Sequence, residues 1–139
     1  MEGGQSTKRG ESPEDLSFEI EFFESLSRRD PTDVRVLEAL AQFYTRSGRF
    51  SDGLRVDRRI VKHAPDNPIA HYNLACSLAL RRRKKDAVEE LRRAFECGYD
   101  DIGWILRDGD LNNLQGYAPF FELLAEMDEK LGRGGPWAD

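Results

Sequence analysis

The chain has 139 residues, enough for one domain, of which 39% are hydrophobic and 34% charged. This balance suits a layered helical protein, in which each helix buries one stripe, better than a protein with a thick globular core. The net charge of −5 argues against a general binder of nucleic acid or of anionic membranes.

The ends of the chain and its cysteines indicate a cytoplasmic protein. Residues 1–11 and 132–139 are expected to be disordered tails. The polar N-terminal stretch has no secretory signal, and no apolar run reaches the length of a membrane span. Cys76 and Cys97 are too few for a disulfide framework, so we expect two buried or half-buried thiols.

Helical periodicity runs through residues 12–131, and no segment alternates as a strand does, which predicts an all-α fold. The first helix is expected to open at residues 12–14, where a serine cap is followed by proline and glutamate. Leu16, Ile20 and Phe23 fall three or four residues apart along it, and Pro31 marks its end.

The second and third helices are expected to occupy the next stretch, up to Pro65. Asp33 is the predicted cap of the second helix, which Gly48 ends by permitting a left-handed residue. Ser51 is the predicted cap of the third. The apolar stripes of these helices consist of Leu37, Leu40, Ala41 and Tyr44 in the second and Leu54, Ile60 and Val61 in the third.

Four further helical segments are predicted after Pro65. Asn67 opens a fourth helix, and Asp86 opens a fifth that stops near Gly98. A short, broken helical region is expected over residues 104–114, and a last helix starts near Pro119.

An internal repeat links these helices. Pro31 and Pro65 lie 34 positions apart, and a capping side chain follows each of them within two residues. The same shift aligns Leu40 with Leu74 and Ala41 with Ala75. We expect the small alanines to let paired helices approach closely and the large leucines to fill the gaps between pairs.

In this repeat the chain resembles the tetratricopeptide (TPR) family, whose unit is a 34-residue helix–turn–helix. The resemblance implies an α-α superhelix with a half repeat at 12–32, repeats at 33–66 and 67–100, and a capping unit at 101–131. Gly53, Asp57 and His71 depart from the family's pattern of alanine, aromatic and large apolar residues, and Tyr99 stands in place of its last proline.

The resemblance also implies a function, because the first helix of each TPR pair lines a concave groove. We therefore expect a non-catalytic adaptor or scaffold that binds a peptide or protein segment there, without a cofactor and without a membrane. Asn73 has an amide that can both donate to and accept from a peptide backbone. The expected groove residues are Arg35, Glu38, Gln42, Arg46, Ile69, Tyr72, Asn73 and Cys76.

Two alternatives stay open at this point. Phe18, Phe22 and Phe23 lie in the half repeat, so the chain is alternatively a self-associating structural subunit. The basic run at residues 81–85 is alternatively a site for an acidic partner or RNA, although cations at a helix C-terminus also form ordinary solvated turns.

Catalytic and metal chemistry find little support in the sequence. No nucleophile stands in a recognisable motif with a base, so we expect no enzyme activity. Asp108 and Asp110 resemble the start of a calcium loop, but the places that need glycine and glutamate hold Asn113 and Pro119. We therefore predict no metal site and expect the two aspartates to cap a short helix.

Overall fold

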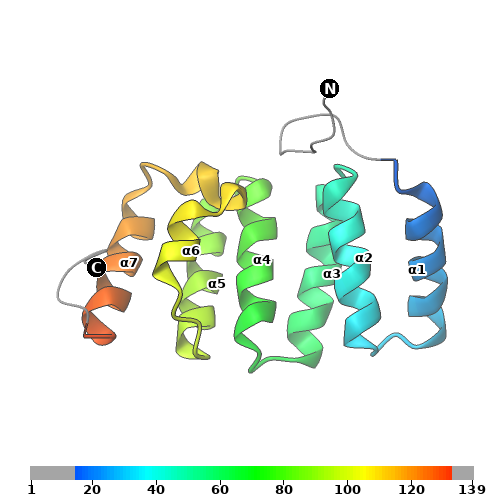
Figure 1. Ribbon diagram of the computed structural model, residues 1–139, viewed down its shortest axis with the longest axis horizontal. Coiled ribbons are helices and arrows are strands. Elements are labelled where there is room, and N and C mark those ends of the chain that lie inside the picture. Colours follow the sequence, from blue (N-terminus) through cyan, green and yellow to red (C-terminus); the bar gives the residue numbers. More distant parts are fainter. Residues whose placement is uncertain (1–14, 133–139) are drawn as a thin grey trace. The chain divides into compact units, whose positions relative to one another are not determined.

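The computed structural model describes residues 15–132, and every regular element within that range is a helix (Figure 1). The all-α prediction is therefore confirmed for this part of the chain. The predicted cap at 12–14, the tail at 1–11 and nearly all of the tail at 132–139 lie outside it. Among the described helices, none is long and apolar enough to cross a membrane.

The first compact unit ends at Pro65, and its described part, residues 15–65, contains three helices. They are α1 (Ser17–Arg29), α2 (Val34–Arg46) and α3 (Phe50–His63). Helix α2 packs against both α1 and α3, so it forms the centre of this unit (Figure 1).

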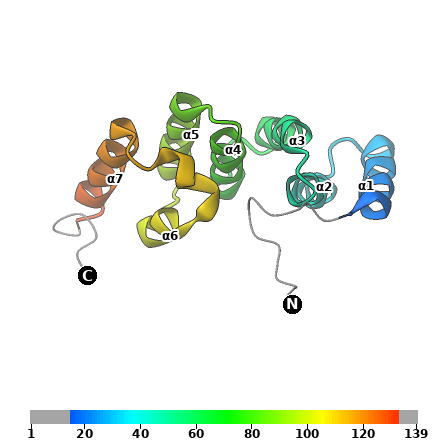
Figure 2. The same cartoon turned by 90° about the horizontal axis from the view of Figure 1, so that it is seen from above.

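The second compact unit starts at Asp66, and four α-helices and one 3-10 helix lie in its described residues, 66–132. Helix α4 packs against α5 and against the 3-10 helix η2, which lie on different sides of it, and α7 packs against α5 (Figure 2). These elements are α4 (Pro68–Leu80), α5 (Lys84–Glu96), α6 (Ile102–Arg107), η2 (Gly109–Leu114) and α7 (Ala118–Lys130).

The helix boundaries recur with a period of 34 residues. Helices α2 and α4 begin at Val34 and Pro68, and α6 begins at Ile102. Helices α3, α5 and α7 begin at residues 50, 84 and 118. The segment predicted as a separate capping unit thus keeps the same register, except that its first helix is interrupted at Asp108 and continues as η2.

The capping side chains explain why these boundaries repeat. Asp33 accepts hydrogen bonds from the backbone N–H groups at the start of α2, and Asn67 does the same for α4. Asp101, a further 34 positions along, accepts one from Trp104 N–H at 2.9 Å. Each cap satisfies backbone donors that have no partner within the helix.

Small residues bring the paired helices together, as predicted. Ala41 and Ala75 are buried, and Ala87 and Ala94 are fully buried within the second unit. At Gly53 a β-carbon would lie 3.0 Å from Thr45 Oγ1, so the close approach of α2 and α3 depends on the missing side chain.

Two predicted helix starts are corrected by the structure. Helix α3 begins at Phe50, one residue before Ser51, and has no side-chain cap. Helix α5 begins at Lys84, two residues before Asp86. In both cases the preceding left-handed turn fixes the start, and Asp86 instead pairs with Arg83 at 2.7 Å.

The turns inside the helix pairs share a left-handed residue, again 34 positions apart. Gly48 and Gly116 have φ angles of 82° and 81°, and the matching residue between α4 and α5 is Arg82, with a φ of 61°. A side chain at such an angle meets the neighbouring carbonyl, at a cost of about 1–2 kcal/mol. Arg82 is therefore a strained residue at a position where its counterparts are glycines.

We expect Arg82→Gly to raise the free energy of unfolding by about 0.5 kcal/mol. Relief of the strain exceeds the entropy that a glycine adds to the unfolded chain. Urea denaturation measures the change. The control is Arg81→Gly, because Arg81 has a φ of −92° and gains nothing from glycine. Equal or opposite effects at the two positions would contradict the assignment of strain to Arg82.

Candidate functional site

One face of α2 carries four polar residues at helical spacing. Arg35, Gln42 and Arg46 are exposed and Glu38 is half-buried, so the structure places all four predicted residues of the first repeat along one surface stripe. Within residues 15–132 the side chains of Arg35, Glu38 and Gln42 form no hydrogen bond or ion pair. We call these four residues the α2 stripe.

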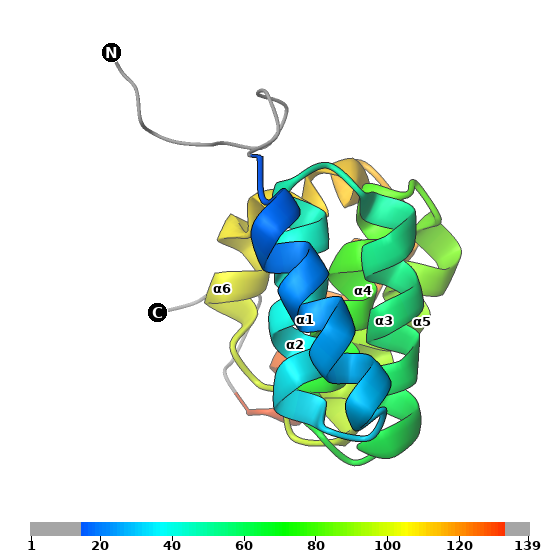
Figure 3. The same cartoon turned by 90° about the vertical axis from the view of Figure 1, so that its right-hand side faces the viewer.

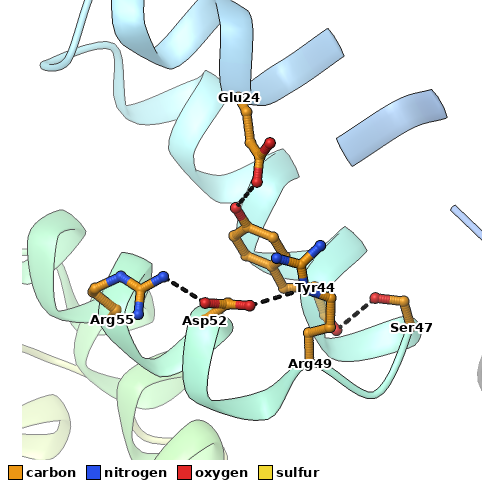
Figure 4. Close-up of polar contacts among 6 residues, drawn as sticks. All are labelled: Glu24, Tyr44, Ser47, Arg49, Asp52 and Arg55. Carbon is orange, nitrogen blue, oxygen red and sulfur yellow. Dashed lines mark hydrogen bonds and ion pairs between the residues drawn. The ribbon is translucent and has the colours of Figure 1, made fainter. Parts of the chain in front are cut away.

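A network on the other face of α2 holds this helix in place (Figure 4). The Tyr44 hydroxyl donates a hydrogen bond to Glu24 of α1, and the Arg49 guanidinium lies 4.7 Å from the centre of the Tyr44 ring. Arg49 Nε also donates to Asp52 at 2.8 Å, while Arg55 donates to the other oxygen of that carboxylate. The network around Tyr44 thus joins α1, α2 and α3.

The same network perturbs the titration of Tyr44. Burial first, and then the hydrogen bond to Glu24 and its charge, raise the pKa of the Tyr44 hydroxyl to about 12. The phenol is 5% exposed, so it stays protonated and able to donate throughout the neutral range. This network therefore fixes the face of α2 that lies opposite the α2 stripe.

The structure corrects the prediction that Tyr72 and Cys76 line an open groove. Tyr72 is 5% exposed and Cys76 is 7% exposed, because η2 packs over that side of α4. The Tyr72 hydroxyl donates to Asp108 Oδ2 at 2.5 Å, and Cys76 Sγ lies 3.7 Å from the same oxygen. The chain's own interrupted helix thus covers these two positions.

Further contacts fasten this covering segment. Asp108 also caps η2 by accepting from Asp110 N–H at 3.0 Å, and Asn113 donates to the carbonyl of Ala79 in α4 at 2.8 Å. On the adjacent side, the ring of Tyr99 stacks on that of Tyr72 at 4.5 Å between centres. The cap that the sequence predicted for Asp108 is confirmed.

Asp108 and Asp110 also approach Cys76, a group that sequence spacing did not reveal. One ligand atom from each residue lies within 4.8 Å of the other two. Burial and the two carboxylates raise the pKa of the Cys76 thiol well above its usual value. Asp108 already accepts hydrogen bonds from Tyr72 and Cys76, so this arrangement favours a hydrogen-bonded network.

The remaining predicted residues of the second repeat reach the surface. Ile69 is 48% exposed and Asn73 is exposed, one turn apart on α4. They stand 34 positions after Arg35 and Ala39 of α2. Only this two-residue part of the expected second-repeat site is available to a partner.

A buried polar pair in the second unit was missed from the sequence. His71 Nδ1 lies 2.7 Å from Glu90 Oε1, and Arg93 Nη1 lies 2.5 Å from the other oxygen of that carboxylate. His71 is 5% exposed, which explains why a histidine can replace a large apolar residue at that position. The pair links α4 to α5.

The basic run at 81–85 covers the turn between α4 and α5 at residues 81–83 and the first two residues of α5, Lys84 and Lys85. Arg81, Arg82, Arg83 and Lys85 are exposed, while Lys84 is half-buried, 5.8 Å from the centre of the Tyr117 ring. Its arginines cap and follow the C-terminus of α4, where positive charge is favourable.

Cys76 is buried and Cys97 is half-buried, as predicted for the two thiols.

No protein-family model matches the chain, and no curated protein matches it in sequence.

Proposed function

We propose that the chain is a TPR-type, non-catalytic interaction module that binds a segment of another protein. Support comes from the 34-residue recurrence of helix boundaries, of the caps Asp33, Asn67 and Asp101, and of the left-handed turns. A superhelical stack of such pairs is part of the proposal, as is a cytoplasmic location.

The α2 stripe is the observation on which this proposal depends. Its polar side chains lie on the surface of a helix whose opposite face is fixed by Leu37, Leu40 and Tyr44, all of them buried. Rigid helices position a binding surface more accurately than loops do. The side chains of Arg35, Glu38 and Gln42 form no hydrogen bond within the described residues, so their polar groups are available to a partner.

The charges of the stripe indicate the chemistry of the partner. Arg35 and Arg46 lie at its two ends, separated by about 16 Å along the helix. Arginine binds carboxylates through two parallel hydrogen bonds. We therefore propose a partner segment with acidic side chains near both of its ends and a polar centre facing Gln42.

The second unit offers a partner fewer exposed residues than the sequence repeat predicts. Because η2 covers Tyr72 and Cys76, we restrict the proposed partner-binding residues of α4 to Ile69 and Asn73. The amide of Asn73 suits a peptide unit, since it donates and accepts at once.

The test uses a displayed library of random twelve-residue peptides, selected on the full-length protein. We expect acidic peptides to be enriched, and the double variant R35E/R46E to bind them at least tenfold more weakly, since each lost charge-assisted pair contributes about 1 kcal/mol or more. Isothermal titration calorimetry with one enriched peptide measures the affinities.

The matched control is Arg58→Glu, which reverses an exposed charge on α3 outside the stripe. It keeps the wild-type affinity if binding is local to α2. Peptides that bind R35E/R46E as tightly as the wild type would rule out the α2 stripe as the site. Equal melting temperatures of all variants show that the fold is unchanged.

A further inference from the structure

A continuous aromatic patch covers the outer face of α1. Phe18 is 77% exposed and Phe22 is 51% exposed, the two largest exposed fractions among the large hydrophobic residues of the described chain. Exposed apolar surface of this kind marks an interaction site more often than an ordinary surface does. In Figure 3 this helix lies in front of α2 and α3, and no described helix of the first unit covers its outer side.

The rings of the patch form one connected row. Phe18 and Phe22 stack with their centres 6.5 Å apart, and Phe23 meets Phe22 edge-on at 5.4 Å. Phe23 in turn contacts Phe43 of α2 at 5.3 Å, so the row continues into the first unit. The inner rings hold the outer ones in a defined orientation, which lowers the entropy that binding costs.

The charges beside the patch change sign along the helix. Asp15 precedes the first exposed phenylalanine, and Arg29 ends the same face after Phe22 and Ser25. Residues 18, 22, 25 and 29 of α1 recur at intervals of three or four, so they share one side of the helix. Asp15 lies two residues before the start of α1, where its carboxylate accepts hydrogen bonds from the N–H and the hydroxyl of Ser17. From Asp15, just before the helix, this side therefore continues through the aromatic residues and Ser25, with the exposed Glu21 beside them, to the basic Arg29.

We propose that the outer face of α1 binds the same face of a second copy of this chain, with the two helices antiparallel about a two-fold axis beside Phe22. In this arrangement Asp15 faces Arg29 of the second copy, and the reverse pair forms at the other end. Phe18 lies over the small Ser25 of the second copy, and the two Phe22 rings pack together at the axis.

The order of residues on the face explains why a second copy fits. A two-fold axis brings residue i opposite residue j and residue j opposite residue i. A face that is acidic at one end and basic at the other is complementary to itself only in the antiparallel orientation. Antiparallel packing also places the bulky Phe18 against the small Ser25, so that no rings collide.

The contact is weak and reversible. One helix face from each copy gives an interface at the small end of the range, below about 1,200 Å² in total. We therefore expect a concentration-dependent equilibrium between monomer and dimer. The α2 stripe takes no part in this contact, so self-association and peptide binding are separate properties.

Sedimentation velocity of the full chain over a range of concentrations tests the proposal. The wild type is expected to form dimers, and Ser25→Trp to be monomeric because the new ring occupies the space for Phe18. Ser51→Trp is the matched control, since Ser51 is exposed on α3 and keeps the wild-type equilibrium. A wild type that stays monomeric up to about 1 mM overturns the proposal.

Charge reversal tests the orientation. Asp15→Arg and Arg29→Glu each place like charges at both ends, and each is expected to raise the dimer dissociation constant roughly tenfold. An equimolar mixture of the two variants restores opposite charges at both ends, so its heterodimer regains the wild-type affinity. Resonance energy transfer between labelled variants detects the heterodimer. If the mixture dissociates as readily as each variant alone, the antiparallel pairing is wrong.

Discussion

Asp108→Ala is expected to lower the free energy of unfolding by about 2–3 kcal/mol, because a charged acceptor serves several donors there. The substitution leaves the Tyr72 hydroxyl and the Cys76 thiol buried without their acceptor. It also removes the cap on Asp110 N–H at the start of η2. Some repulsion from the nearby Asp110 carboxylate is relieved, which keeps the loss below the sum of these terms. Urea denaturation at neutral pH measures the difference.

Two further variants separate this network from a general charge effect. Asp108→Asn keeps an oxygen for Tyr72 and for the cap, so it is expected to lose about 1 kcal/mol or less. Asp66→Ala removes the same charge from an exposed residue of the same unit and leaves stability unchanged within about 0.5 kcal/mol. If Asp108→Ala resembles Asp66→Ala, the contacts between η2 and α4 contribute little.

Alkaline pH is expected to destabilise the protein through its buried tyrosines. The pKa of Tyr44 is about 12 in the folded chain against 10.0 in the unfolded one, and burial is the largest cause. Between these values the folded state binds more protons, so the contribution of Tyr44 to stability is constant below pH 10 and falls as pH rises toward about 12. For Tyr44 the loss is on the order of 2 kcal/mol. Burial also raises the pKa of Tyr72, which adds to the loss in the same direction.

Urea denaturation at pH 8 and at pH 11.5 gives the size of this effect. Tyr44→Phe has no phenol to ionise at that position, so its stability should fall less between the two pH values than that of the wild type. Tyr117→Phe is the matched control, because Tyr117 lies in the second unit and is only half-buried. An identical fall in Tyr44→Phe and in the wild type would show that Tyr44 is not a source of the alkaline instability.

Local chemistry made most of the fold predictable. The caps Asp33 and Asn67 and the glycine at 48 act within a few residues of themselves, so the sequence shows them directly. The start of α5 was placed two residues late, because Arg82 occupies a left-handed position that a glycine would have revealed. Spacing alone was therefore sufficient for the helices and insufficient where an unusual residue forms the turn.

The candidate site was harder to predict, because contacts between residues distant in the sequence decide which of its side chains are exposed. Arg35, Gln42 and Arg46 are exposed as expected, since the periodicity of one helix decides which side faces outward. Tyr72 and Cys76 are covered by a segment more than 30 positions later in the chain. Asp108-Gly109 gave a signal, because both residues are poor helix formers in the middle of a repeat helix. Nothing local indicates where the displaced segment then packs.

The hydrogen bond from Asn113 has a consequence for the basic turn. The carbonyl oxygen of Ala79 accepts from Asn113 Nδ2 and also from Arg82 N–H, at 2.8 Å and 2.9 Å. One backbone atom thus links the strained arginine to the 3-10 helix. If η2 moves away from α4, the Ala79 carbonyl loses one of these two donors. The conformation of the turn at residues 81–83, and with it the position of its three arginines, therefore depends in part on Asn113.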